Sequence, residues 1–134
     1  MKTCTKCGIP KPLSEFFKDK QKKDGHRPDC KTCNIEKSTA WQRNNKEKRY
    51  GYDIKYKYGV SLQEYQKMLK DQNNKCALCE KHIDECNTRF HVDHNHKTGK
   101  VRALLCVKCN HGIGAFMEDK KLLKEAVKYL DKYA

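Results

Sequence analysis

Four cysteine pairs with an identical two-residue gap constrain this chain more than any other feature of its sequence. Eight of the nine cysteines among its 134 residues form Cys-x-x-Cys pairs, namely Cys4/Cys7, Cys30/Cys33, Cys76/Cys79 and Cys106/Cys109. Random placement would produce only roughly 0.6 such pairs. A tight turn that presents two thiolates to one tetrahedral ion needs this gap, whereas a disulfide framework has no reason to repeat it. The spacing therefore predicts two structural zinc sites, each built from two pairs.

The rest of the composition explains why the chain needs such sites. Hydrophobic residues make up 37% of the sequence, and 134 residues are enough for one modest domain or two very small ones. Cores this small are usually stabilised by disulfides or structural metals. The N-terminus carries no apolar signal segment and no run approaches the length of a membrane span, so we expect the cysteines to be reduced in a cytoplasm. Cys86 stands outside the pairs, and an incidental reduced cysteine is favoured over a spare ligand or a redox thiol.

The net charge points to a polyanionic partner. Thirty Lys and Arg against seventeen Asp and Glu give a formal charge of +13. Two sites of four thiolates around Zn²⁺ would reduce this to about +9, which is still strongly basic for so small a protein. The usual partner of such a surface is nucleic acid before membrane. Charge alone does not separate this interpretation from a lysine-rich face that only serves solubility.

The N-terminal half divides into a metal-dependent unit and a basic helix. Residues 1–34 hold two of the cysteine pairs and predict a zinc ribbon or a treble-clef-like unit that can hardly fold without metal. Residues 35–58 predict a basic helical linker without a clear apolar stripe. Such a helix bridges two modules or lies along phosphates, so three of its cations are candidate nucleic-acid contacts: Arg43, Lys46 and Arg49. The tyrosine- and lysine-rich stretch at 50–59 is interpreted as the joint between the two halves.

Residues 59–134 predict a small zinc-stabilised α+β domain. Ser61 and Glu64 form a capping-box pattern at the start of a helix with one apolar face. Alternating residues then predict two strands joined by a polar turn, followed by a short helix and by a last helix that Asp119 caps. The expected ranges are 88–92 and 99–105 for the strands and 110–117 for the short helix, with Leu122, Leu123, Ala126, Val127 and Leu130 of the last helix facing inward.

Three histidines and one aspartate are concentrated at the end of the first of these strands. Residues 91–96 read His-Val-Asp-His-Asn-His and hold half of the six histidines. Side chains alternate along a strand, so His91 and Asp93 share one face and His94 takes the other until the turn begins. The cluster is open to three interpretations: a further structural zinc site, a solvated polar turn, or catalysis. Catalysis is favoured, because the cysteines already suffice for zinc and imidazoles that titrate near neutral pH gather here.

The residue types in this cluster suit hydrolysis of a phosphodiester bond. That reaction needs a base for the attacking water and a cation that stabilises the leaving oxygen. His94 suits the base. Asp93 offers a hard oxygen ligand to Mg²⁺ or a related ion, and Asn110 offers a second one if its helix packs against the hairpin. A zinc ion bound by the last two cysteine pairs would enforce that packing.

Three motifs carry a family resemblance: Cys76-x-x-Cys79, His91-x-Asp93-His94-Asn95-His96, and the run Thr-Gly-Lys-Val-Arg-Ala-Leu-Leu-Cys-x-x-Cys-Asn at residues 98–110. In spacing and order they are similar to those of the phage recombination endonuclease VII family of HNH nucleases, over about residues 58–131. The resemblance implies a ββα-metal (His-Me finger) core in which Asp93 and Asn110 bind Mg²⁺ or Mn²⁺ and His94 is the general base. It also implies supporting roles for His96 and His91.

The sequence departs from the family's pattern in two places. Asn95 stands where the archetype has a second aspartate, a change we expect to be tolerated because that side chain is not assigned to the metal. The first 50 residues differ from the archetype's helical dimerisation region, so a homodimer is left open. Arg102 is interpreted either as a phosphate contact or as an ordinary surface arginine on a strand.

The sequence therefore predicts a metal-dependent DNA endonuclease that makes nicks or double-strand breaks or cleaves branched DNA. Its expected partner is DNA rather than a membrane, and its expected place is the host cytoplasm if a phage encodes it. Two rival functions remain. One is a non-catalytic zinc-ribbon protein that binds DNA or regulates transcription, and the other is a structural or RNA-binding accessory protein.

Overall fold

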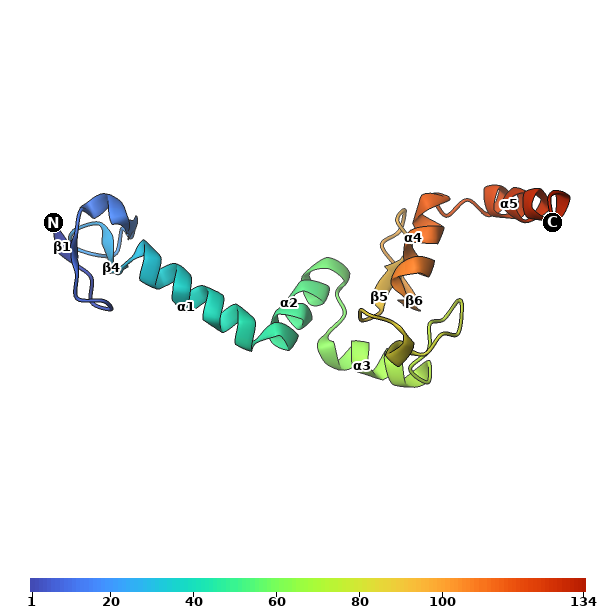
Figure 1. The fold of residues 1–134 in the computed structure, drawn as a ribbon, viewed down its shortest axis with the longest axis horizontal. Coiled ribbons are helices and arrows are strands. Elements are labelled where there is room, and N and C mark those ends of the chain that lie inside the picture. Colours follow the sequence, from blue (N-terminus) through green and yellow to red (C-terminus); the bar gives the residue numbers. More distant parts are fainter. The chain divides into compact units, whose positions relative to one another are not determined.

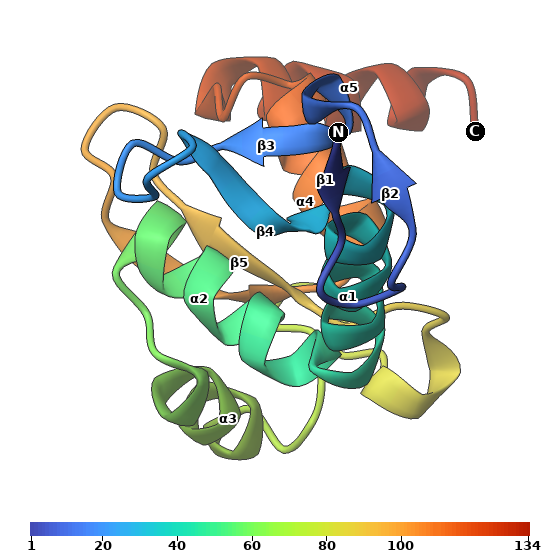
Figure 2. The same ribbon diagram turned by 90° about the vertical axis from the view of Figure 1, so that its left-hand side faces the viewer.

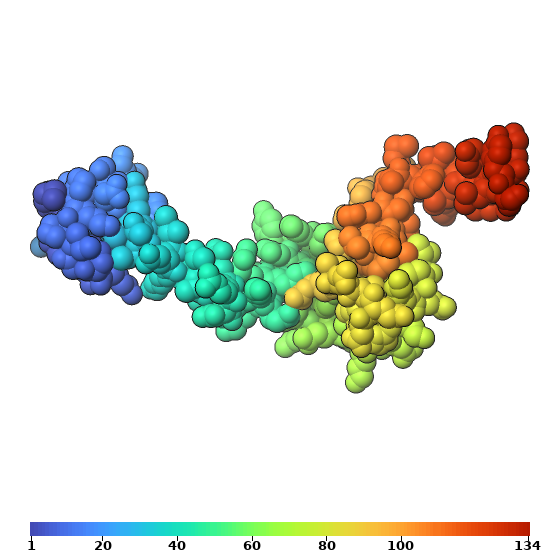
Figure 3. Space-filling view, in the orientation of Figure 1, coloured from blue at the N-terminus to red at the C-terminus, as the bar shows by residue number.

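The computed structural model describes all 134 residues, and the chain forms two compact units at residues 1–49 and 50–134. The colour bars of Figure 1 and Figure 3 locate the units, since the first runs from blue into cyan-green and the second continues from green to red. Each unit is described by itself.

The first unit follows the order knuckle, hairpin, helix. Strands β1 (Lys2–Thr3) and β2 (Pro10–Lys11) pair around the first cysteine turn, and after a short 3-10 turn β3 (Phe16–Lys18) pairs with β4 (His26–Cys30). Helix α1 (Lys31–Asn44) begins directly after β4, with Cys30 as its N-cap, as Figure 2 shows. Of the two forms expected for this unit, this order is the treble clef.

The buried apolar residues of the first unit are few. Its buried cluster contains only Cys4, Phe16 and Cys30, with Cys33 packed against it. Three of these four residues belong to the cysteine pairs. A cluster of this size cannot offset the conformational entropy lost on ordering some fifty residues, so the unit needs the metal that its cysteines are arranged to bind.

Helix α2 (Lys46–Tyr58) differs from the joint expected at 50–59. The chain breaks its helical run only at Asn45 and then continues as helix through Gly51. Ile54 is buried, and Tyr50 and Tyr58, four residues away on either side, pack against the same core. The tyrosine-lysine alternation concealed this four-residue spacing, which marks one face of a helix. The stretch interpreted as a joint is therefore helical up to Tyr58, as a helical linker over 35–58 implies, and its buried face packs on the core of the second unit.

The core of the second unit lies between two helices and a hairpin. Helix α3 (Leu62–Asp71) starts with the expected capping box of Ser61 and Glu64. Its buried Tyr65 donates a 2.9 Å hydrogen bond from the hydroxyl to the carbonyl of Phe90. Strands β5 (His91–His94) and β6 (Val101–Leu105) pair antiparallel, and α4 (Val107–Ala115) follows at once and packs on both. Strand, turn, strand and helix thus occur in the predicted order.

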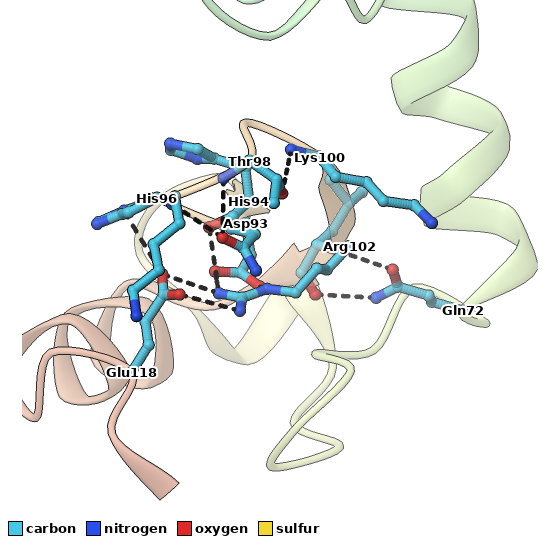
Figure 4. A network of polar contacts seen from close by, with 11 residues as sticks. Gln72, Asp93, His94, His96, Thr98, Lys100, Arg102 and Glu118 are labelled. Carbon is cyan, nitrogen blue, oxygen red and sulfur yellow. Dashed lines mark hydrogen bonds and ion pairs between the residues drawn. The ribbon is translucent and has the colours of Figure 1, made fainter.

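Gln72, directly after α3, connects this helix to the hairpin. Its side-chain amide pairs with the backbone of β6 as a neighbouring strand would. Its amide nitrogen donates to the carbonyls of Lys75 (2.9 Å) and Leu104 (3.0 Å), and its amide oxygen accepts from the Leu104 N–H (2.9 Å). Figure 4 shows Gln72 facing β6 along these two bonds to Leu104. The side chain therefore satisfies backbone groups on the free edge of β6.

Replacing Gln72 with alanine is expected to lower the free energy of unfolding by about 1–3 kcal/mol, because the N–H of the buried Leu104 loses the amide oxygen that accepts from it. Urea unfolding followed by circular dichroism measures the change. Gln66→Ala is the matched control, since Gln66 is exposed on the same helix. Equal effects of the two substitutions would contradict the role given to Gln72.

Helix α5 (Lys120–Lys132) starts as expected with Asp119 as its N-cap, but its apolar residues do not face inward. No residue of α5 is buried, and Val127 and Leu130 are 59% and 67% exposed. Met117 and Glu118 both have left-handed backbone angles, which turn the chain before the helix, and α5 makes no extensive contact with another element. The expected burial was therefore wrong. None of the helices has the length and apolar character needed to span a membrane.

Candidate active site

Both cysteine quartets gather in the structure. In each of them the four sulfur atoms lie within 4.8 Å of one another, and Cys79 Sγ lies 3.8 Å from Cys106 Sγ. Four thiolates held tetrahedrally at the usual 2.3 Å from Zn²⁺ are about 3.8 Å apart. The two quartets, Cys4/Cys7/Cys30/Cys33 and Cys76/Cys79/Cys106/Cys109, therefore have the size and chemistry of structural zinc sites.

Backbone N–H groups stabilise the thiolate form of two of these cysteines. The N–H of Cys106 donates to Cys76 Sγ at 3.3 Å, and in the first unit the N–H of Cys30 donates to Cys4 Sγ at 3.2 Å. Burial raises the pKa of Cys76, but backbone N–H donors outweigh it and lower that pKa to about 6. Burial and N–H donors oppose each other in the same way at Cys4, whose pKa also falls to about 6. Thiolates are the form that binds zinc.

The second quartet connects the hairpin to α4. Cys106 directly follows β6 and is the N-cap of α4, and Cys109 lies in the first turn of this helix. The other two ligands come from the turn after α3, where the N–H of Ala77 bonds to the carbonyl of Leu104 at 3.1 Å. A metal at this quartet would therefore fix where α4 lies against β5, which is the role the sequence predicted for it.

Asp93 is the buried acid of the second unit, with 8% of its surface exposed. The guanidinium of Arg102 binds both of its oxygens, from Nε to Oδ2 at 2.6 Å and from a terminal nitrogen to Oδ1 at 2.9 Å. The terminal nitrogens of Arg102 also bind Glu118, at 3.2 and 3.3 Å. Figure 4 shows Arg102 lying between the two carboxylates. Hydrogen bonding to Asp93 is the main reason why the pKa of Arg102 is raised.

A β-bulge explains why Arg102 reaches Asp93. Asp93 pairs with Ala103, but His94 pairs with Val101, so the register shifts by one residue and Arg102 has no partner across the ladder. In a regular ladder Arg102 would lie opposite His94, on the other face of the hairpin from Asp93. The bulge redirects its side chain, as bulges beside functional sites often do.

Replacing Arg102 with alanine is expected to lower the free energy of unfolding by about 1–3 kcal/mol, because the buried carboxylate of Asp93 loses its charged partner. Chemical unfolding of the zinc-loaded chain measures this. The control is Lys67→Ala, which removes an ion pair with Asp71 whose two side chains are well exposed, and which should cost less than about 0.5 kcal/mol. A loss for Arg102→Ala no larger than that of the control would refute the assignment.

A cavity of about 320 Å³ brings the predicted metal ligands together. Asp93 from β5 and Asn110 from α4 both line it, and His96 and His111 contribute to its wall. Glu118 completes the polar part of the lining, and its carboxylate lies 3.8 Å from Nε2 of His96. The structure therefore places a carboxylate and an amide from separate elements at one site, as the sequence predicted for a packed hairpin and helix.

The other two histidines of the cluster, His94 and His91, each contact one histidine that lines the cavity. The half-buried ring of His94 is 5.0 Å from the ring of Tyr58 and 4.7 Å from that of His96, measured between centroids. His91 contacts His111 at 5.8 Å, and burial, followed by the charge of His111, lowers the pKa of His91. His94 thus lies next to a wall residue of the Asp93–Asn110 cavity, with its ring held between two others.

Sequence reasoning missed Glu118 and His111 at this site. Glu118 lies in a left-handed turn between two helices, where no periodic pattern exists to identify it. His111 follows Asn110 directly, and that adjacency was the only available signal. The predicted contacts Arg43, Lys46 and Arg49 are exposed around the break between α1 and α2 and are not part of this cavity.

A β-hairpin followed by a helix, with an acid on the strand and an amide on the helix beside a four-cysteine cluster, defines a small protein of the ββα-metal class. The chain belongs to the recombination endonuclease VII family, whose sequence model matches residues 51–132. The match covers the whole hairpin and α4, so all residues of the cavity lie within it.

Two phage proteins and one solved structure are similar to the chain. It is 38% identical over 76 residues to the Gene 59 protein of Mycobacterium phage D29 and 35% identical over 104 residues to the Gene 59 protein of Mycobacterium phage L5. These matches cover 56% and 77% of the chain but only 46% and 60% of the relatives. The crystal structure of the ββα-Me type II restriction endonuclease Hpy99I matches with a TM-score of 0.41 and 28% identity, over 98% of this chain and 65% of that one.

Proposed function

We propose that this protein is a metal-dependent DNA endonuclease that hydrolyses phosphodiester bonds. The observation that carries the proposal is the cavity in which Asp93 and Asn110 meet, with His94 beside its wall. Membership of the recombination endonuclease VII family supports DNA as the substrate.

The donor set of the cavity fits a hard divalent ion. Asp93 offers carboxylate oxygens and Asn110 an amide oxygen, and Mg²⁺ usually takes one or two protein ligands and keeps several waters. Arg102 uses one lone pair on each oxygen of Asp93, which leaves others for a metal. We therefore assign Asp93 and Asn110 as ligands of Mg²⁺ or Mn²⁺. Such an ion stabilises the charge that develops on the leaving oxygen.

His94 is assigned as the general base. The contacts with Tyr58 and His96 limit the rotation of its ring, and a base held in one orientation against its substrate is more effective than a free one. His96, exposed at the cavity wall, is assigned to assist the leaving group, and His91, which contacts His111, is assigned a supporting role. These roles follow the family's pattern.

The first unit and the basic helices are assigned to DNA binding rather than to cleavage. The first unit contains its own cysteine quartet, and all residues that line the Asp93–Asn110 cavity belong to the second unit. Arg43, Lys46 and Arg49 are exposed, and the net charge of +13 favours a polyanion. Zinc is assigned to both quartets. The phage relatives favour the host cytoplasm as the place of action.

Cleavage of two DNA substrates tests this function. Supercoiled plasmid and a branched DNA are incubated with the pure protein and Mg²⁺ or Mn²⁺, and the products are separated on gels. We expect cleavage that depends on added metal. Nicked circles would indicate one active site per event, and linear molecules would indicate that two chains act together. Binding without cleavage of either DNA would overturn the proposal in favour of a non-catalytic DNA-binding protein.

A further inference from the structure

A second, larger groove adjoins the Asp93–Asn110 cavity. It has a volume of about 610 Å³ and is formed by the turn after β5 and the start of α5. Its lining includes Lys97, Lys120 and Lys121, and it shares His96 and Glu118 with the cavity. A ligand in the groove would therefore reach the edge of the site. The volume lies within the range of about 300–1,000 Å³ that is usual for ligand sites.

The two acids of the groove are already occupied. Glu118 is bound by Arg102. Asp119 caps α5, since its Oδ1 accepts from the N–H groups of Lys121 (2.8 Å) and Leu122 (3.2 Å). The ammonium groups of the three lysines form no ion pair or hydrogen bond. The groove therefore holds three lysines against two carboxylates, and these carboxylates bind Arg102 and the start of α5 rather than the lysines.

The positions of these lysines do not serve the stability of the fold. Lys120 and Lys121 occupy the first turn of α5, where the helix dipole favours acids and disfavours cations, and no acid is present in that turn. Lys97 is fixed at the tip of the hairpin, because Asn95 Oδ1 accepts from the N–H groups of Lys97 (2.8 Å) and Thr98 (3.1 Å). Asp119, as the N-cap, already supplies the acid that stabilises this end of the helix, so the lysines add nothing to the helix and are available to an anionic ligand.

We propose that this groove binds the phosphodiester backbone of the DNA strand that enters the cavity, next to the phosphate to be cleaved. The proposal rests on the proposed function, since it takes DNA as the substrate. Lys97 from the hairpin and Lys120 and Lys121 from α5 contact successive phosphates of this backbone. Contacts of this kind set where the strand lies and do not read its sequence.

The salt dependence of DNA binding tests the groove. Each lysine–phosphate contact with duplex DNA adds about 0.9 to the slope of log K against log salt concentration. The full-length, zinc-loaded double variant Lys120→Ala/Lys121→Ala should therefore show a slope shallower by about 1–2. Its affinity for a branched DNA at 0.1 M salt should fall by about tenfold or more. Binding is measured by fluorescence anisotropy between 50 and 200 mM KCl without added divalent ions, so that no cleavage occurs.

A matched variant separates the groove from bulk charge. Lys124→Ala/Lys132→Ala removes the same charge from the same helix, and neither residue lines the groove. We expect it to keep a slope near that of the wild type. Equal losses in both double variants, or no change of slope in the groove variant, would overturn the proposal. A groove variant impaired for single-stranded RNA but not for DNA would also overturn it.

Plasmid cleavage by the wild type, measured with the same protein preparations, tests the proposed function separately from the groove. Plasmid cleavage by the wild type with unchanged binding in the groove variant would overturn the groove and leave the nuclease standing. A reduced slope in the groove variant with no cleavage by the wild type would support the groove as a DNA contact and overturn the nuclease.

Discussion

Replacing Cys76 with serine should abolish the folded state of the second unit and, with it, all cleavage of DNA. Cys76 is 1% exposed and belongs both to the second quartet and to the core cluster that contains Phe90 and Leu104. Apparent binding free energies of structural zinc sites are about 10–16 kcal/mol at neutral pH, and this energy is part of the folding free energy. Total stabilities of small domains are about 5–15 kcal/mol, so the loss of this site is not compensated elsewhere.

Two measurements on the Cys76→Ser variant check this result. Metal analysis should fall from two zinc ions per chain to one, and the thermal transition of the second unit should disappear from circular dichroism. A wild-type value near one zinc ion would mean that the first unit has been misread. Removal of zinc from the wild type by a chelator should also abolish the thermal transition of the second unit, because metal binding and folding are linked.

Cys86→Ser is the matched control for this prediction. Cys86 is a half-buried thiol outside both quartets, and its Sγ contacts the carbonyl of His82 at 3.6 Å. We expect this variant to keep two zinc ions, its thermal transition and its cleavage of DNA. A Cys76→Ser variant that stays folded with full activity, or a Cys86→Ser variant that loses zinc, would contradict the assignment of the quartets.

Replacing His94 with alanine is expected to lower the rate of DNA cleavage by about 10²–10⁴-fold, which is the usual contribution of a general base. His94 is only half-buried, and its ring contacts only the rings of Tyr58 and His96 among aromatic side chains. The variant should therefore remain folded. Its affinity for DNA should stay within a fewfold of that of the wild type. A loss of rate at unchanged affinity separates catalysis from binding.

His26→Ala is the control for the histidine change. His26 lies in β4 of the first unit, where its ring contacts the carbonyl of Asp24 at 2.8 Å. The substitution removes one imidazole from the chain without touching the Asp93–Asn110 cavity. Its cleavage rate should match that of the wild type. If His26→Ala cleaved as slowly as His94→Ala, the slow cleavage by His94→Ala would be explained by a general loss of folding and not by the loss of a base.

Local rules predicted the parts of this structure that depend on neighbouring residues. The cysteine spacing predicted both quartets, and the capping residues Ser61 and Asp119 predicted the starts of two helices. Asp93 and Asn110 were expected at one site because the cysteines on either side require the hairpin and α4 to pack together, and both line one cavity. In each case the signal lies within a few residues or in a metal-ligand spacing.

The remaining features depend on contacts that a local pattern cannot contain. The bond between Arg102 and Asp93 requires a β-bulge, and nothing in the sequence of β6 distinguishes a bulged arginine from one on the opposite face. Glu118 joins this network from a turn after α4. The apolar residues of α5 have helical spacing, but spacing states only that a face exists and not that another element covers it.

The two units also show how one scaffold is used twice. Each has a cysteine knuckle, a hairpin and a helix whose N-cap is a cysteine, and the second hairpin contributes Asp93 and, from its turn, His96 to the cavity. The shared scaffold explains stability, and the side chains on the second hairpin carry the proposed chemistry.

The nuclease proposal is tested most directly by single-turnover cleavage of supercoiled plasmid with Mg²⁺ by the wild type, His94→Ala and His26→Ala at matched DNA occupancy. We expect cleavage by the wild type and by His26→Ala, and a rate at least about 10²-fold lower for His94→Ala with its DNA binding preserved. A wild type that binds the plasmid without cutting it, or a His94→Ala variant that cuts as fast as the wild type, would contradict the account.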